Sequence, residues 1–254
     1  MPRTIDDFLA LGGPSRVIAH RGFSGRAPEN TLAAFRQALE VGADMIELDV
    51  HLSMDGEIVV IHDADLSRTT NGKGRVRDLT LAQLKKLDAG TSFSVDLAGE
   101  LIPTLAEVLE LVAGRMLLNI EIKVTGEIQG GITEKVLTLI GEKRMGNQVI
   151  LSSFDPRALS HSRKIDPGVR TASLYNEVLH AGKSPIQIME EVGSVALNLR
   201  HDQVTADMVA MCHRHGRAVA VYTVNQPAQM RALFDLEVDA LFTDRPDAMI
   251  GLVK

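Results

Sequence analysis

Eight short apolar runs, most of them rich in β-branched residues, recur along this 254-residue chain and constrain its fold more than any other feature. Polar turns bound each run, a pattern typical of strands that are buried on both faces. The runs are Val17–Ala19, Met45–Val50, Leu117–Glu121, Val149–Leu151, Thr171–Leu174, Val195–Leu197, Val219–Val221 and Ala240–Phe242. Strands of this kind need helices on the faces of their sheet, which favours an α/β architecture.

Stretches with helical periodicity separate most of these runs. They are Thr31–Glu40, Leu105–Val112, Thr133–Glu142, Ala206–Arg214 and Ala228–Phe234. Eight strands that alternate with helices predict a closed (β/α)₈ TIM barrel, in one domain over residues 1–254. An open doubly wound sheet is the structural alternative. The residues before the first strand predict a short lead-in helix.

Residues of about 51–104 interrupt the alternation and predict a small insertion after the second barrel strand. The apolar run Ile58–His62 follows Val50 too closely for a parallel crossover. Asp55-Gly56 is a dipeptide favoured in two-residue type I′ turns, so a hairpin is expected here.

Centring that turn on Asp55-Gly56 pairs Met54 with Glu57 and places His62 opposite Asp49. We therefore expect His62 to lie beside Asp49. The rest of the insertion, Ala64–Gly99, is expected to cap one side of the barrel mouth.

The composition excludes several classes of protein. With 27 Lys and Arg against 33 Asp and Glu, the formal net charge is −6, so no nucleic acid partner is expected. No apolar run approaches the roughly 20 residues that cross a bilayer, which predicts no stable membrane insertion. The single cysteine, Cys212, cannot form an intramolecular disulfide, and a cytoplasmic location fits. A monomer or a homodimer is expected.

Three acidic residues occupy strand ends, where the active sites of barrels gather. Glu47 and Asp49 alternate toward the same side of the second strand, and Glu121 ends the next barrel strand. Three buried carboxylates would repel one another unless they were protonated or bound to a cation. Such an all-oxygen set favours Mg²⁺ or Ca²⁺. The alternative is that the carboxylates cap loop amides or pair with Arg21 and Lys123.

Two histidines, His20 and His62, are expected at the same mouth. Because imidazole changes charge near neutral pH, the pair can act as general base and general acid. His51 shares their predicted face and is kept only as a possible substrate contact. The remaining histidines are predicted to lie on the surface; they are His161, His180, His201, His213 and His215.

Arg21 and Lys123 would supply positive charge beside these groups. Arginine can hold two phosphate oxygens at once, and lysine acts as a mobile point charge. A salt bridge to the neighbouring acids is the alternative role, and the two roles are compatible. A cation, two imidazoles, an arginine and a lysine together point to metal-assisted hydrolysis of a phosphate ester.

These residues together resemble the glycerophosphodiester phosphodiesterase family, over nearly the whole chain from about residue 16. Each matching motif is short, but seven follow one another in order. They are His20-Arg21-Gly22, Pro28-Glu29-Asn30-Thr31, Glu47-Leu48-Asp49-Val50, Asp55-Gly56 with Val60-Ile61-His62-Asp63, Glu121-Ile122-Lys123, Tyr222-Thr223-Val224-Asn225 and Phe242-Thr243-Asp244-Arg245-Pro246.

The resemblance implies hydrolysis of a small glycerophosphodiester to sn-glycerol 3-phosphate and an alcohol. It implies His20 and His62 as the acid/base pair, and Glu47, Asp49 and Glu121 as ligands of a divalent cation. It implies that Arg21 and Lys123 hold phosphate and that Tyr222, where the family often has Trp, packs against the glycerol. Attack by a glycerol hydroxyl, through a cyclic phosphate, and direct attack by water are both open.

Two other functions are weighed against this one. A related barrel enzyme of phospholipase D type, acting on lysophospholipids, would need an apolar rim. The insertion from Asp65 to Asp78 is instead polar and partly basic, with Arg68, Lys73, Arg75 and Arg77, which favours a soluble substrate. A non-catalytic protein that binds phosphate metabolites would tolerate loss of a histidine or an acid, yet every expected position is filled.

Overall fold

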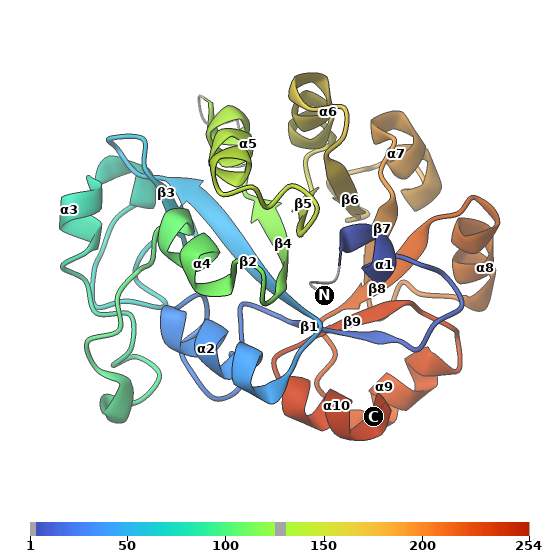
Figure 1. Cartoon of the computed structure of the whole chain (residues 1–254), viewed down its shortest axis with the longest axis horizontal. Helices are drawn as coiled ribbons and strands as arrows, with labels where there is room; N and C mark the ends of the chain where they lie inside the picture. The colour runs from blue at the N-terminus through green and yellow to red at the C-terminus, as the bar shows by residue number, and fades with distance from the viewer. Residues whose placement is uncertain (1–3, 125–130, 254) are drawn as a thin grey trace.

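The computed structural model describes residues 4–124 and 131–253, and over these residues it is a closed barrel of eight parallel strands. Hydrogen bonds join β1 to both β2 and β9, which closes the ring (Figure 1). The strands are β1 (Arg16–Ala19), β2 (Met45–Leu52), β4 (Leu117–Ile122), β5 (Val149–Ser153), β6 (Arg170–Leu174), β7 (Ala196–Arg200), β8 (Ala218–Tyr222) and β9 (Ala240–Thr243). The predicted TIM barrel is confirmed, and the open sheet is wrong.

Helices surround the barrel as an outer ring (Figure 1). They are α2 (Leu32–Val41), α4 (Leu105–Val112), α5 (Ile132–Glu142), α6 (Pro156–Ile165), α7 (Pro185–Val192), α8 (Ala206–Arg214), α9 (Pro227–Phe234) and α10 (Pro246–Val253). The main apolar core lies between these helices and the outer face of the sheet. Helix α2 lies on the predicted stretch Thr31–Glu40, and local residues set its ends: the Thr31 side chain caps its first turn, and Gly42 ends it with a φ of 78°.

The predicted lead-in helix is α1 (Ile5–Phe8), and it closes the amino end of the barrel (Figure 1). Ile5 and Phe8 are buried in a separate apolar cluster with residues at the starts of the strands, such as Met45, Leu117 and Ala240. The helix is tied down by a hydrogen bond from the Ile5 amide to the Asn147 carbonyl, 2.8 Å long. The interior is therefore filled at the end opposite the carboxyl ends of the strands.

The hairpin after β2 exists, but the predicted register is wrong by one residue. Strand β3 (Ile58–Val60) pairs His51 with Val59, so Asp49 lies opposite Ile61. The Ser53 amide bonds to the Glu57 carbonyl, which leaves a three-residue loop that ends in Gly56 with a φ of 79°. Asp-Gly suits this longer turn as well as the two-residue turn, and the Asp55 carboxylate stabilises it by accepting from the Ser53 hydroxyl at 2.6 Å.

The insertion between β3 and α4 has its own small core. It contains the 3₁₀ helix η1 (Val76–Asp78), helix α3 (Leu81–Leu84) and the 3₁₀ helix η2 (Val95–Leu97). Buried side chains from it, including Leu66, Leu84 and Ile102, pack against Val59 and Ile61 of the hairpin. The insertion is thus a packed unit attached to one side of the barrel.

Among the described residues, the helices are all too short or too polar to cross a bilayer.

We predict that Phe8→Ala lowers the stability of the barrel without changing its active site. Loss of a buried phenyl ring typically costs about 3 kcal/mol, which corresponds to a fall in Tm of roughly 6–12 °C for a chain of this size. Thermal unfolding followed by circular dichroism measures the effect. Leu11→Ala, at an exposed position just after α1, is the matched control. An unchanged Tm in Phe8→Ala would show that the packing of α1 against the amino end of the barrel contributes nothing to stability.

Candidate active site

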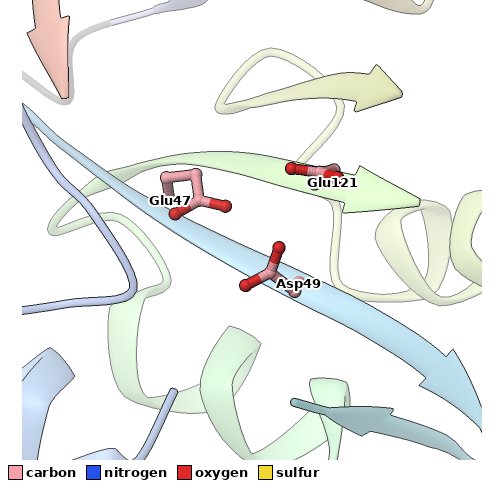
Figure 2. Close-up of side chains that lie close together, drawn as sticks. All are labelled: Glu47, Asp49 and Glu121. Carbon is pink, nitrogen blue, oxygen red and sulfur yellow. The ribbon is translucent and has the colours of Figure 1, made fainter. Parts of the chain in front are cut away.

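Three carboxylates meet inside the carboxyl end of the barrel, as predicted from the sequence. Parallel pairing of β2 with β4 sets Asp49 directly beside Glu121, and strand alternation points Glu47 to the same side (Figure 2). One oxygen from each of the three lies within 4.8 Å of the others. Their residues are only 3%, 1% and 8% exposed for Glu47, Asp49 and Glu121, so little water solvates the charges.

Burial and mutual repulsion make this cluster costly when it is fully ionised. Burial, followed by the charges of Asp49 and Glu121, holds the pKa of Glu47 well above its ordinary value. Burial also raises the pKa of Glu121. For Asp49, burial opposes ionisation, but Lys123 and Arg21 outweigh it and lower the pKa. Asp49 is therefore ionised, and an added positive charge would stabilise the ionised forms of Glu47 and Glu121.

The two positively charged side chains predicted at this site, Lys123 and Arg21, both contact the carboxylates. Lys123 Nζ lies 2.8 Å from Asp49 Oδ1 and 2.5 Å from Glu121 Oε1. Arg21 Nε lies 3.4 Å from Asp49 Oδ2, and the Arg21 amide donates to Glu47 Oε2 at 2.9 Å. Both cations are thus engaged in salt bridges, which was the alternative role considered for them.

The turn that carries His20 and Arg21 needs an unusual backbone. Arg21 adopts a φ of 56°, in the left-handed region, and Gly22 follows with a φ of 83°. A Cβ at Gly22 would lie 2.7 Å from the Ala34 backbone carbon, so only glycine lets this turn approach α2 so closely. The turn folds back over the barrel mouth and presents His20 to the cluster.

The His20 ring lies between Glu47 and Asp244, and its contact with Asp244 fixes its orientation. Its Nδ1 lies 2.7 Å from Asp244 Oδ1, just after β9, and its Nε2 lies 4.0 Å from Glu47 Oε2. Burial opposes ionisation of Asp244, but hydrogen bonds from His20, Asn225 and Ser24 bring its pKa to about 2. An ionised carboxylate can only accept, so Nδ1 donates and Nε2 is left free toward the carboxylates.

His62 is held in the same way on the other side. Its Nδ1 lies 2.6 Å from Asp63 Oδ1, and the Asp63 pKa is about 2, because bonds from Arg68 and His62 outweigh its burial. Burial lowers the pKa of His62, with Lys123 and Arg21 acting in the same direction against Asp49. The His51 ring is buried, and its Nε2 donates to the His62 carbonyl at 3.0 Å. His51 thus supports the backbone of His62.

An open cavity of about 1530 Å³ begins at His62, Glu121 and Lys123 and extends over the ends of β4, β5 and β6. Phe154 lines it, and its ring meets the Tyr222 ring edge-on at 6.2 Å. The Tyr222 hydroxyl donates to the Tyr175 carbonyl at 3.1 Å. Tyr222, at the end of β8, therefore packs edge-on against an aromatic side chain that lines the cavity.

The prediction that His180 lies on the surface is wrong. It is 6% exposed in the loop between β6 and α7. Its Nδ1 accepts from the Asn176 amide at 3.1 Å, and its Nε2 donates to the Phe154 carbonyl at 2.7 Å. A loop histidine is buried here because it links two loops, which its sequence neighbourhood does not reveal.

The residues present fit a hard divalent cation. Oxygen atoms alone form the cluster, they converge within bonding range of one ion, and two of the three carboxyls have raised pKa values that a bound cation would bring down. Zinc sites usually include imidazole or thiolate ligands. Carboxylate oxygens suit both Mg²⁺ and Ca²⁺.

Four supporting residues had been given no catalytic role from sequence. Asp244 and Asp63 orient the two histidines, and Asn30 donates its amide to Asp49 Oδ2 at 2.8 Å. Glu29 accepts from Arg21 Nη1 at 2.9 Å. The signal for the two aspartates was their place at strand ends. The partner of Asp63 is the adjacent His62, whereas His20, the partner of Asp244, is 224 residues away along the chain.

A parallel barrel with carboxylates, imidazoles and cations at the carboxyl ends of its strands defines a (β/α)₈-barrel enzyme. This chain belongs to the glycerophosphoryl diester phosphodiesterase family, whose model matches residues 20–248. It is an enzyme of the phosphoric diester hydrolase class.

Relatives cover almost the full length of the chain. A glycerophosphodiester phosphodiesterase of Caldanaerobacter subterraneus subsp. tengcongensis is 41% identical over 94% of this chain and 97% of its own length. One of Bacillus altitudinis is 40% identical over 94% of this chain and 98% of its own length.

Among solved structures, a phosphodiesterase of Oleispira antarctica in complex with the product sn-glycerol-3-phosphate matches with a TM-score of 0.83 and 32% identity. That match covers 94% of this chain and 96% of the other. A glycerophosphodiester phosphodiesterase of Agrobacterium tumefaciens matches with a TM-score of 0.82 and 31% identity, over 93% of this chain and 99% of the other.

We predict that Glu47→Gln raises the stability of the metal-free protein at neutral pH. A carboxyl whose pKa is raised by folding loses stability as pH rises from its unfolded value of about 4.3 toward the folded value. The Tm of the variant should therefore exceed that of the wild type by an amount that grows as the pH rises above about 4.3, at roughly 2–4 °C per kcal/mol. Calorimetry in the presence of a chelator measures it.

The exposed Glu40→Gln is the matched control and should show no such pH dependence. Added Mg²⁺ or Ca²⁺ should stabilise the wild type more than Glu47→Gln. Equal stabilisation of both proteins would remove Glu47 from the cation site.

Proposed function

We propose that this enzyme hydrolyses glycerophosphodiesters to sn-glycerol 3-phosphate and an alcohol, with a divalent cation, Mg²⁺ or Ca²⁺, as cofactor. The observation that carries the proposal is the pair of aspartate-bound imidazoles, His20 and His62, on either side of three converging carboxylates. The family membership and the product complex of the Oleispira antarctica relative support the same substrate class.

In this proposal, His20 and His62 divide the proton transfers. Each ring donates Nδ1–H to an aspartate, which leaves Nε2 to take a proton from the attacking oxygen or, once protonated, to give one to the departing alkoxide. The lowered pKa of His62 favours its neutral form at neutral pH, the form that a general base needs. Attack by a glycerol hydroxyl and attack by water use the same two rings.

Glu47, Asp49 and Glu121 would hold the cation, which when bound neutralises charge that grows on the phosphoryl oxygens. Lys123 and Arg21 lie against the same carboxylates and can turn their remaining N–H groups to a phosphate. Tyr222, beside Phe154, would pack against the glycerol. A cytoplasmic location, a homodimer and the single-domain boundary at residues 1–254 stay predictions from the sequence.

A second candidate activity is cleavage of lysophospholipids by the same chemistry. Val178 is 84% exposed and Leu179 is 67% exposed in the loop between β6 and α7, and Leu179 lines the large cavity. An apolar pair beside the cavity could receive part of an acyl chain. The polar insertion on the other side of the mouth favours the water-soluble diester as the main substrate.

We predict that His62→Ala and His20→Ala each keep the fold and lower kcat about 10²–10⁴-fold, the usual contribution of a general acid or base. Release of glycerol 3-phosphate from glycerophosphocholine, in the presence of Mg²⁺ or Ca²⁺, measures the loss. His201→Ala, at an exposed position, is the control. Near-normal turnover in either active-site variant would refute its role, and binding without turnover in the wild type would refute the proposed function.

We predict that glycerophosphocholine is cleaved with at least about tenfold higher kcat/KM than lysophosphatidylcholine. Replacing Val178 and Leu179 together by serine should reduce only the residual activity on the lipid, because the soluble substrate has no acyl chain to lose contact. Met54→Ser, at an exposed apolar position in the hairpin turn, is the control. A preference of the wild type for the lipid would make the second candidate the main activity.

A further inference from the structure

Arg68 connects the insertion to both sides of the active site. It lies between β3 and η1, outside the residues so far given a catalytic role, and it makes three hydrogen bonds to two carboxylates. Its Nε donates to Asp63 Oδ2 at 2.5 Å. Its two Nη atoms donate to the two oxygens of Glu29 at 2.8 and 2.7 Å, a bidentate pair.

On one side, Arg68 fixes the carboxylate that orients His62. Asp63 uses Oδ1 for His62 Nδ1 and Oδ2 for Arg68 Nε, so both of its oxygens are held. The Asp63 side chain is 30% exposed, and without Arg68 water could take the second oxygen and let the carboxylate turn. The direction of the His62 ring therefore depends on the guanidinium.

On the other side, Arg68 shares Glu29 with Arg21. Glu29 Oε1 accepts from both Arg68 Nη2 and Arg21 Nη1, at 2.7 and 2.9 Å. Arg21 in turn lies against Asp49. The Arg68 guanidinium thus lies in the middle of a chain of contacts that connects the imidazole of His62 to Arg21, the side chain proposed to bind phosphate.

Hydrogen bonds and burial hold the backbone on both sides of Arg68, which lets the residue act as a support. Leu66 is fully buried, and its amide bonds to the Gly74 carbonyl at 3.0 Å. Thr70 is buried, and its hydroxyl bonds to the Leu66 carbonyl at 2.7 Å. Asp65 caps the start of this turn through the Ser67 amide at 2.9 Å.

We propose that Arg68 is a positioning residue that aligns His62, through Asp63, and Arg21, through Glu29, and that delivering it is what the insertion contributes to the reaction. The inference rests on the proposed function of the site. The planar guanidinium holds Glu29 with two N–H groups and Asp63 with a third, and an ammonium lacks this fixed fork.

The test compares Arg68→Met with Arg77→Met, an arginine of the same insertion whose Nε lies 4.0 Å from Asp78 Oδ1. With glycerophosphocholine and Mg²⁺ or Ca²⁺, Arg68→Met should lower kcat about 10–100-fold, the usual effect of losing a residue that supports catalytic groups, and raise KM several-fold. Arg77→Met should match the wild type. Arg68→Lys keeps the charge without the fork and should fall between Arg68→Met and the wild type.

A double-mutant cycle separates positioning from a general structural effect. If Arg68 acts on kcat through Asp63, Arg68→Met should cost little further kcat in an Asp63→Ala background. Additive losses in the cycle would overturn the inference.

The two hypotheses fail differently. A wild type without glycerophosphodiester hydrolysis refutes the proposed function. An active wild type with Arg68→Met as fast as Arg77→Met refutes only the role of Arg68.

Discussion

The repulsion among Glu47, Asp49 and Glu121 is the constraint around which the mouth of this barrel is arranged. Carboxylates buried this deeply cannot all be charged in a region of low dielectric without compensating cations. Lys123 and Arg21 supply part of the compensation through salt bridges within the barrel mouth. The two imidazoles and their aspartates stand just outside this charged centre, so the groups that move protons are separate from those suited to hold an ion.

Much of the fold was readable from the sequence because barrel strands are buried on both faces. A run such as Met45–Val50 has no polar alternation except where Glu47 and Asp49 turn inward, so strand and site residues were found together. The α2 boundaries were readable because Thr31 and Gly42 are local signals. The candidate cluster followed from these, since parallel strands bring their carboxyl ends to one rim.

The features that sequence missed depend on contacts between distant segments. His20 and Asp244 are 224 residues apart, and only the closure of the ring between β1 and β9 brings them within 2.7 Å. The burial of His180 depends on a carbonyl in another loop, and the bidentate contact of Arg68 with Glu29 crosses from the insertion to the α2 side. The hairpin register was wrong because Asp55-Gly56 suits two turn lengths, and the choice depends on how Asp55 bonds to Ser53.

The short helix α1 determines from which end molecules can enter and leave the described part of the barrel. The apolar side chains of Ile5 and Phe8 close the amino end of the barrel. Among the described residues, the charged centre is therefore open to water at the carboxyl end of the strands. The substrate and the products of hydrolysis then pass through the same opening. The product that keeps the phosphate must therefore leave through the opening by which the next phosphodiester enters.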